Sequence, residues 1–288
     1  MSIDVDGYLA RLGLPRPGGG PSVAGLRRLH EAHVERIPYE ALDIQLGRMT
    51  SIDPYWAAER ITAKGRGGYC YHLNGAFSLL LRELGYDVTW HRSGGQNHGE
   101  PPPGSAWANH LGLTVHGLPD EESPSGDWLI DAGMGDGIHG PLPLRYGEYT
   151  QGPMTFRLSR SDTDPGGWRF DHDPGGSFAG MDFAPAVAEV GAFAERHEYL
   201  STSPRSGFVR TCVVMRREAR GVDSLTGCVL RRAGDLAPPR TIDDQAEWWA
   251  VLDEIFGLRP ADLDPAERAV IWDRVHSAHK EWQRTRPA

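Results

Sequence analysis

Arg66-Gly67-Gly68-Tyr69-Cys70 places a cysteine directly after a glycine-rich turn and directly before a strongly apolar stretch, 73–84. This arrangement predicts a helix that begins at the cysteine. A thiol at a helix N-terminus lies at the positive end of the helix dipole, and Arg66 is close in sequence, so both favour the thiolate. A lone buried cysteine is usually inert. Here Gly67 and Gly68 would let a substrate approach and would leave backbone N–H groups for an oxyanion.

A nucleophilic cysteine needs a base, and His110 is the candidate. It lies in the strand-like segment 107–115, where Leu111, Leu113 and Val115 alternate with it, so His110 faces the opposite side. A strand histidine is more often a surface or satisfied core residue, and the chain has 12 histidines. As a functional residue, His110 would take the thiol proton and return a proton to the leaving group.

The candidate that orients the base is Asp131, within the apolar segment 128–132. An aspartate inside an apolar strand is costly unless it is paired or hydrogen-bonded. Asp131 therefore has a reason to accept a hydrogen bond from an imidazole N–H and to set the tautomer of the ring. The simpler reading is a turn residue before Gly133. Together, the order Cys70, His110, Asp131 predicts acyl transfer or hydrolysis through a thioester.

Composition narrows the class of protein. The chain has 288 residues, 39% of them hydrophobic, and a formal net charge of −9. That charge argues against nucleic acid or an anionic membrane as the main partner. The three cysteines have no Cys-x-x-Cys spacing, so neither a disulfide scaffold nor a zinc ribbon is expected, and no metal is assigned. Without a signal-peptide core or an apolar run of membrane-spanning length, we expect a soluble cytoplasmic protein.

The chain changes character in thirds. The first third predicts helices with N-caps at Ser22 and Asp53 and a stop at Gly85, over the ranges 4–12, 22–37, 55–63 and 70–84. The middle third predicts an antiparallel sheet or small barrel, separated by the loops 94–104, 119–126 and 135–143, with strands over 86–92, 109–116, 128–132, 154–160 and 168–171. The last third predicts strands over 208–216 and 226–232, a helix capped by Thr241 that runs to 256, and a helix over 264–284.

At these residues the chain resembles the arylamine N-acetyltransferase family, including its related actinobacterial amide synthases. The resemblance covers nearly the whole length. It is carried by five short motifs: Arg66 to Cys70, Ile37 to Leu42, Asp131 to Gly135, Thr202-Ser203-Pro204, and Phe256-Gly257-Leu258. It implies an α+β fold with a cysteine-protease-like Cys-His-Asp core: a helical bundle over 1–85, a β-barrel over 86–198 and an α/β lid over 199–288.

The resemblance also implies residue roles. Cys70 would be the acetylated nucleophile, with His110 as base and Asp131 as orienter. Arg66 and Glu40 would form an ion pair that braces the cysteine turn. Acetyl-CoA would be the acyl donor, and its contacts would come from two stretches: Gly133, Met134 and Gly135, and Thr202 and Ser203.

Three positions depart from the family pattern. His72 stands where glutamate is common, and Ala41 stands where asparagine is usual. Met134 replaces a phenylalanine that borders the acceptor pocket in family members. Because methionine is more flexible than phenylalanine, the acceptor could differ or be bulkier.

The expected reaction is transfer of an acetyl group from acetyl-CoA to an arylamine, arylhydrazine or N-arylhydroxylamine through an acetyl-cysteine. The alternative is an amide synthase that moves a polyketide acyl chain from a carrier-protein thioester onto an aryl amine. A thiol protease or amidase uses the same three residue types, and a fold kept only as a binding module is the non-enzymatic rival. Motifs alone do not specify the acceptor, the physiological donor or the oligomeric state.

Overall fold

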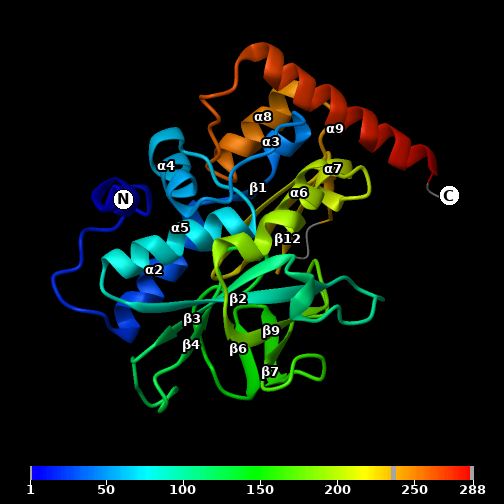
Figure 1. Cartoon of the computed structure of the whole chain (residues 1–288). Helices are drawn as coiled ribbons and strands as arrows, with labels where there is room; N and C mark the ends of the chain where they lie inside the picture. Colours follow the sequence, from blue (N-terminus) through cyan, green and yellow to red (C-terminus); the bar gives the residue numbers. More distant parts are fainter. Residues whose placement is uncertain (1, 235–237, 286–288) are drawn as a thin grey trace.

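Helices form most of the N-terminal part of the chain, as the capping residues predict. The computed structural model describes residues 2–234 and 238–285 (Figure 1). The N-terminal helices are α1 (Val5–Arg11), α2 (Val23–Arg36), α3 (Leu42–Gln45), α4 (Pro54–Lys64) and α5 (Cys70–Glu83). Asp4, Ser22 and Asp53 each accept a backbone N–H at a helix start. These side chains satisfy donors that a helix leaves unpaired at its first turn.

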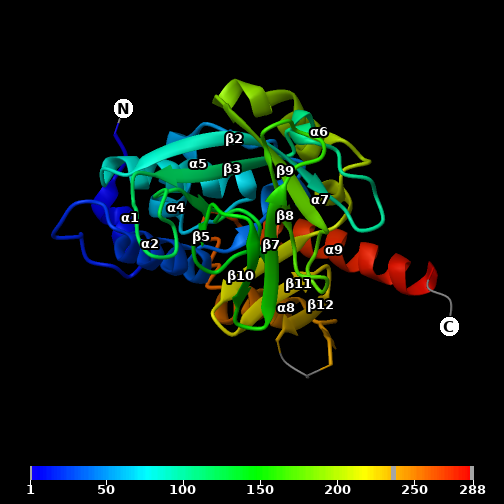
Figure 2. The same cartoon turned by 90° about the horizontal axis from the view of Figure 1, so that it is seen from below.

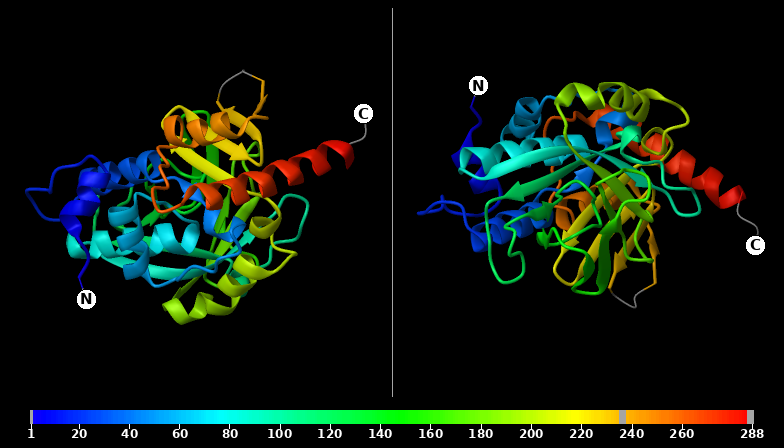
Figure 3. Two further views of the ribbon diagram at one scale, coloured as in Figure 1. Left: turned by 90° about the horizontal axis from the view of Figure 1, so that it is seen from above. Right: turned by 60° about the horizontal axis from the view of Figure 1, so that its bottom comes forward.

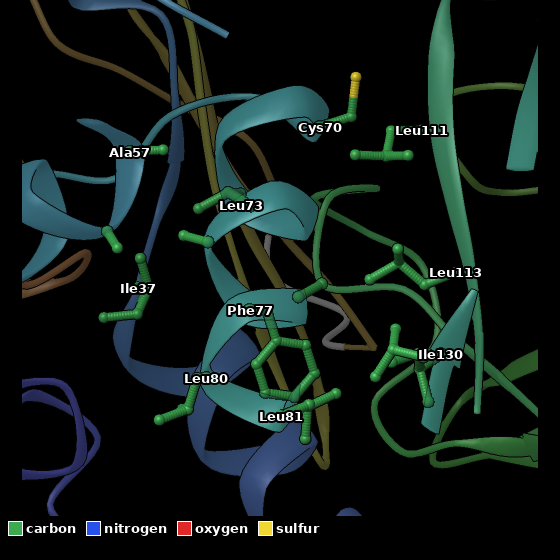
Figure 4. Packing of buried hydrophobic residues seen from close by; sticks show 14 of the residues in the cluster. Ile37, Ala57, Cys70, Leu73, Phe77, Leu80, Leu81, Leu111, Leu113 and Ile130 are labelled. Atoms are coloured by element: carbon green, nitrogen blue, oxygen red, sulfur yellow. The ribbon is translucent and has the colours of Figure 1, made fainter. Parts of the chain in front are cut away.

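Helix α5 is the centre of the largest hydrophobic cluster. Every residue from Cys70 to Leu81 is buried, because both sides of the helix are covered. Figure 4 shows Leu73 and Leu80 on the side of the helix that faces Ala57 and Ile37, and Leu81 on the side that faces Leu111, Leu113 and Ile130 of the neighbouring strands. Burial on this scale holds the first turn of α5, and with it Cys70, at a set depth in the protein.

The middle of the chain forms one antiparallel sheet of eight strands, which curls in the manner of a barrel. Its order is β5-β4-β3-β2-β9-β8-β7-β6, and Figure 2 shows β3, β2, β9, β8 and β7 as neighbouring ribbons. The strands are β2 (Asp87–Gln96), β3 (His110–His116), β4 (Trp128–Ile130), β5 (Leu142–Pro143), β6 (Gly147–Gln151), β7 (Met154–Arg160), β8 (Trp168–Asp171) and β9 (Gly180–Val187).

Four strands of this sheet differ from the sequence prediction. Strand β9 was not predicted, because a buried Asp182 and an exposed Pro185 interrupt its apolar pattern. Strand β6 was missed because it is polar and lies at the sheet edge. Strand β2 continues to Gln96, through glycines that were assigned to a loop. Strand β4 ends at Ile130, so Asp131 is the first residue after the strand rather than part of it.

The third part of the chain forms a second antiparallel sheet, ordered β1-β10-β11-β12-β13. Its strands are β1 (Tyr39–Glu40), β10 (Val213–Glu218), β11 (Gly221–Thr226), β12 (Val229–Ala233) and β13 (Arg240–Thr241). Strand β1 comes from the N-terminal third and pairs Tyr39 with Met215. Helices α8 (Gln245–Glu254) and α9 (Pro265–Thr285) pack their apolar residues with this sheet, and the end of α9 extends away from the body (Figure 3).

The predictions for this third part need correction in three places. Residues 207–210 form a short helix, α7 (Gly207–Arg210), instead of the start of a strand. The predicted strand over 226–232 is split, because a turn at Gly227 joins β11 to β12. Asp244, and not Thr241, accepts the N–H bond that caps α8. In each case a local glycine or side-chain hydrogen bond outweighs the pattern on which the prediction rested.

A small linking helix completes the part of the fold that positions the site. Helix α6 (Ala194–Thr202) and the preceding turn η2 (Val190–Phe193) lie between the two sheets in the chain. Helix α6 crosses the boundary that was predicted at residue 198. Strand β1, from the first third of the chain, belongs to the sheet of the last third. The division into the ranges 1–85, 86–198 and 199–288 therefore stays a prediction. None of the described helices has the length and apolarity that crossing a bilayer requires.

Candidate active site

Cys70 is the first residue of α5, as predicted, and Tyr69 is the helix N-cap with an extended backbone. The cysteine is 4% exposed. Its Sγ lies 3.7 Å from the carbonyl oxygen of Asn109, directly before His110. The thiol therefore stands at the positive end of a 14-residue helix, against the start of β3.

The structure brings Cys70, His110 and Asp131 together. Nε2–H of His110 donates to Oδ2 of Asp131 at 2.6 Å, which leaves the other ring nitrogen for Cys70, whose side chain is close enough to raise the pKa of the ring. Burial acts to lower the pKa of His110, but the charges of Asp131 and Cys70 outweigh it and raise the pKa to about 10. The ring is thus held in one orientation and favours the protonated form.

Asn74, which was not among the predicted site residues, holds Asp131 in place. Its Nδ2–H donates to Oδ1 of Asp131 at 2.8 Å and to the Leu111 carbonyl at 2.7 Å, while its Oδ1 accepts the N–H of Ala132 at 2.8 Å. Asn74 is fully buried four residues after Cys70, on the same face of α5. A polar residue at that spacing in an apolar helix was the available signal.

The peptide of Asp131 is fixed as well. Its backbone N–H donates to Nε2 of His30 at 3.1 Å, and Nδ1–H of His30 donates to the His139 carbonyl at 2.9 Å. Burial lowers the pKa of His30 to about 4, against the opposing effects of these contacts. His30 is therefore neutral at pH 7, as an acceptor nitrogen must be.

Arg66 and Glu40 do pair, within a larger buried cluster of charges. Nε of Arg66 lies 3.0 Å from Oε1 of Glu40, and both side chains are fully buried. Arg60 lies 2.7 Å from Glu40, and Nη1 of Arg66 also contacts Asp262 at 3.1 Å. Asp43 contacts both arginines, at 2.6 and 3.1 Å. No pattern in the sequence indicated Arg60, Asp43 or Asp262 as members of this cluster.

This cluster braces the turn before Cys70. Nε–H of Arg60 donates to the Gly67 carbonyl at 2.8 Å, and Glu40 N–H donates to the Gly68 carbonyl at 2.9 Å. Burial acts to raise the pKa of Glu40, but Arg66 and Arg60 hold it well below its usual range. The cluster therefore keeps its charges and ties the nucleophile turn to β1.

The two glycines of the turn serve close packing inside the protein. A Cβ at Gly67 would lie 1.8 Å from the Pro38 carbonyl oxygen, and a Cβ at Gly68 would lie 2.6 Å from the ring of His72. The space that was expected to admit a substrate at these two positions is thus occupied by Pro38 and His72. Any other residue here would displace the turn that carries Cys70.

Tyr69 and His72 belong to a buried network behind the nucleophile. Nδ1 of His72 accepts the Tyr69 N–H at 3.3 Å, and its Nε2–H donates to Oγ1 of Thr50 at 2.9 Å. The Tyr69 hydroxyl donates to Nδ1 of His197 on α6, whose Nε2–H donates to the Thr50 carbonyl at 2.6 Å. Burial, with a smaller effect of Arg60, lowers the pKa of His72 to about 3. His72 therefore caps α5 as a neutral ring.

The residues predicted to contact acetyl-CoA are not all equally near the nucleophile. A Cβ at Gly133 would lie 2.7 Å from Cα of Cys70, and the Gly133 N–H donates to Oδ1 of Asp131 at 2.9 Å, so this N–H is engaged inside the protein. Met134 is buried in the hydrophobic cluster of the eight-stranded sheet, which also contains Leu129. Gly135 has φ of 79°. This loop is adjacent to the nucleophile mainly through Gly133.

Thr202 and Ser203 lie at the end of α6. The hydroxyl of Thr202 donates to the Glu198 carbonyl at 2.7 Å, and Oγ of Ser203 accepts the Arg205 N–H at 3.3 Å. Among the described residues, no hydrogen bond joins either side chain to Cys70, His110 or Asp131. Their connection to the site runs through α6, which contacts Tyr69 through His197.

The arrangement is suited to acyl transfer. Cys70 supplies a nucleophile, His110 a base that Asp131 orients, and the start of α5 supplies backbone N–H groups without helical partners. These are the components that form and discharge a thioester.

Comparison with known proteins agrees with this chemistry. A family model described as N-acetyltransferase matches residues 22–263. An arylamine N-acetyltransferase of Mycolicibacterium smegmatis is 30% identical over 284 residues, which cover 91% of this chain and 94% of that protein. A Salmonella typhimurium arylamine N-acetyltransferase / N-hydroxyarylamine O-acetyltransferase is 41% identical over 88 residues, 31% of each chain. Proansamycin X synthase of Amycolatopsis mediterranei is 34% identical over 168 residues, 56% of this chain and 60% of that one.

Solved structures extend the likeness to the whole fold. The arylamine N-acetyltransferase of Mycobacterium marinum superposes with a TM-score of 0.81 at 25% identity, covering 96% of this chain and 99% of that one. The same enzyme in complex with CoA superposes with a TM-score of 0.80, with the same identity and coverage.

Proposed function

This chain belongs to the arylamine N-acetyltransferase family, and on that premise we propose that it transfers an acetyl group from acetyl-CoA to an arylamine, arylhydrazine or N-arylhydroxylamine. The observation that carries the proposal is the Cys70–His110–Asp131 arrangement inside a chain whose family match spans residues 22–263. Acetyl-CoA is the co-substrate, and the transfer proceeds in two halves through an acetyl-cysteine.

In the first half, the Cys70 sulfur attacks the carbonyl carbon of the acetyl thioester. A carbon–sulfur bond forms to Cys70, and the bond from that carbon to the CoA sulfur breaks. The Cys70 thiol has given its proton to His110 before the attack, and protonated His110 passes that proton to the departing CoA sulfur. Backbone N–H groups at the start of α5 stabilise the oxyanion, each worth about 3 kcal/mol.

In the second half, the acceptor nitrogen attacks the carbonyl carbon of the acetyl-cysteine. A carbon–nitrogen bond forms, the carbon–sulfur bond to Cys70 breaks, and an N–H proton passes to His110, which restores the thiolate beside a protonated ring. Aromatic amines suit this step because they are weakly basic and stay unprotonated at neutral pH. Asp131 keeps the imidazole oriented in both halves.

The remaining roles are part of the same proposal. Arg66 and Glu40 brace the nucleophile turn through their buried pair. Gly133, Met134 and Gly135, with Thr202 and Ser203, are proposed to contact the donor, supported by the position of Gly133 against Cys70. We also propose a reducing compartment such as the cytoplasm, since all three cysteines are free thiols.

The direct test is intact-protein mass spectrometry after incubation with acetyl-CoA. A gain of about 42 Da, an acetyl group in place of hydrogen, should appear and should vanish when an aromatic amine is added. Cys70→Ser should gain nothing. Cys212→Ser is the matched control and should behave as wild type, because burial raises the pKa of Cys212 to about 12 and leaves it a thiol. A fully active Cys70→Ser would defeat the proposal.

The similarity to proansamycin X synthase supports a second candidate, an amide synthase that takes its acyl chain from a carrier protein. Such an enzyme would use a long carrier-bound thioester and ignore acetyl-CoA. Comparing Cys70 acylation by acetyl-CoA with acylation by a long-chain thioester on a carrier protein separates the two. Efficient acetylation of Cys70 by acetyl-CoA would establish the acetyltransferase function over the amide synthase.

A further inference from the structure

The guanidinium group of Arg196, a residue of α6, lies against two aromatic rings. Its guanidinium carbon lies 3.9 Å from the centroid of the Trp107 ring and 4.4 Å from that of the Tyr199 ring. Trp107 is 47% exposed, while Arg196 and Tyr199 are half-buried. Stacking on both sides holds the planar group in one place and leaves the N–H groups at its edge to bind something else.

No carboxylate neutralises this cation within the described part of the chain. Nε of Arg196 is buried and has no hydrogen-bond partner there. Burial lowers the pKa of Arg196, and the groups that act to raise it are Tyr199 and Tyr71 rather than an acid. Arg60 and Arg66, by contrast, each contact two or more carboxylates. In a chain with a net charge of −9, an arginine without an acidic partner is available to an anion from outside.

Both sides of the stack are tied to the catalytic residues. Trp107 is three residues before His110, and between them the Ala108 carbonyl accepts the Tyr71 hydroxyl at 2.6 Å. Ala108 has φ of 47°, the left-handed region, so this short segment is tightly constrained. The Trp107 side of the stack is thus fixed relative to the start of α5 and to His110.

The other side of the stack is α6, which is fixed by its inner face. His197, next to Arg196, accepts a hydrogen bond from the Tyr69 hydroxyl, and Oγ of Ser201 lies 3.3 Å from the same hydroxyl oxygen. Tyr69 directly precedes Cys70. Arg196 is therefore carried by a helix that is anchored to the nucleophile turn.

We propose that Arg196, with Trp107 and Tyr199, forms an anion-binding subsite for a substrate of the acyl transfer. The anion would be a phosphate of the acyl donor or a carboxylate on the aromatic acceptor, since a guanidinium edge recognises both groups by paired N–H donors. The inference rests on the proposed function.

The two-step reaction lets each source be tested separately. Arg196→Gln removes the charge, and Arg28→Gln, at an exposed arginine of α2, is the matched control. The donor comparison is single-turnover acetylation of Cys70 by acetyl-CoA and by S-acetyl-N-acetylcysteamine, a neutral thioester. The acceptor comparison is kcat/KM for 4-aminobenzoate and for aniline. Arg196→Gln should slow the charged member of one pair about tenfold and the neutral member less than about twofold.

Selective loss with acetyl-CoA assigns the subsite to the donor phosphate, and selective loss with 4-aminobenzoate assigns it to the acceptor carboxylate. Arg196→Lys keeps the charge but not the planar stack, so it should recover part of the loss. Equal losses for charged and neutral members, or no loss in an active folded variant, would overturn the inference. A wild type that forms no acetyl-cysteine would instead defeat the proposed function, and this inference with it.

Discussion

Asn74 and Asp131, which are 57 residues apart in sequence, meet at 2.8 Å through an amide N–H and a carboxylate oxygen. The amide also holds the backbone on both sides, at the Leu111 carbonyl and the Ala132 N–H. A single side chain on the nucleophile helix therefore sets the position of the carboxylate that orients His110. Cys70 and Asp131 are thus held together in one rigid unit, although they come from separate segments of the chain.

Replacing Asn74 by alanine should slow acylation of Cys70 about tenfold or more, as loss of a group that orients a catalytic side chain commonly does. The unfolding free energy should also fall by about 1–3 kcal/mol, because Asp131 loses a donor while it stays buried. Single-turnover acetylation measures the first effect and urea unfolding the second. Asn97→Ala, in an exposed loop, is the control, and wild-type acylation by Asn74→Ala would show that Asp131 needs no such support.

The charge cluster predicts unequal effects for two acids that contact Arg66. Glu40→Gln should lower the unfolding free energy by about 3–5 kcal/mol, because it removes the fully buried carboxylate that pairs with two buried arginines. Asp262→Asn should cost about 1 kcal/mol or less, since its side chain is 25% exposed and Arg66 keeps other partners. Urea unfolding with an unchanged slope checks both. Asp6→Asn, from an exposed surface pair, should change nothing measurable, and equal effects at Glu40 and Asp262 would contradict the ranking.

His110 predicts a loss of stability at alkaline pH. Its pKa in the folded protein is about 10, above the ordinary 6.5, so the native state holds a proton that the unfolded chain releases between these values. The stability from this interaction is complete below pH 6.5 and is lost as the pH rises through 10. Asp131→Asn should remove most of it and flatten the curve between pH 7 and 10. NMR titration of His110 should give a midpoint well above 6.5, and a midpoint near 6.5 would refute the paired arrangement.

His72 predicts a loss of stability on the acid side. Its pKa in the folded protein is about 3, so below pH 6.5 the unfolded chain takes up a proton that the native state does not. Stability from the neutral ring is present above pH 6.5 and falls as the pH drops toward 3, at up to about 1.4 kcal/mol per pH unit. His72→Gln keeps an acceptor for Tyr69 and a donor for Thr50 and should reduce this slope. His98→Gln, at an exposed position, should leave it unchanged. Equal slopes in wild type and His72→Gln would exclude this cause.

Several parts of the fold and site were predictable because their causes are local. Asp4, Ser22 and Asp53 cap helices through bonds that span two or three residues, and Gly85 follows α5 with φ of 88°. The apolar run after Cys70 placed the nucleophile at a helix start. The strands of residues 154–160 and 168–171 follow plain alternation and were predicted to the residue.

Other parts were misjudged because distant partners decide them. Strand β9 contains buried Asp182, which is stable there only because Ser161 and Arg169 contact it at 2.7 and 2.9 Å. Gly67 and Gly68 were read as openings for a substrate, whereas Pro38 and His72 fill that space. A local pattern cannot show which side chain will occupy the space beside a glycine.

By itself the sequence determined where the reactive cysteine lies, which residue types could serve it and which helices would form around it. These follow from capping, hydrophobic periodicity and the chemistry of single residues, all of which act over a few positions. The tertiary structure alone decided that Asn74 holds Asp131 and that Asp262 reaches Arg66 across 196 residues. It also decided that Arg196 is stacked on Trp107 without an acidic partner in the described chain. Such contacts depend on how separate segments pack, because burial makes each polar or charged group find a partner wherever the fold brings one close.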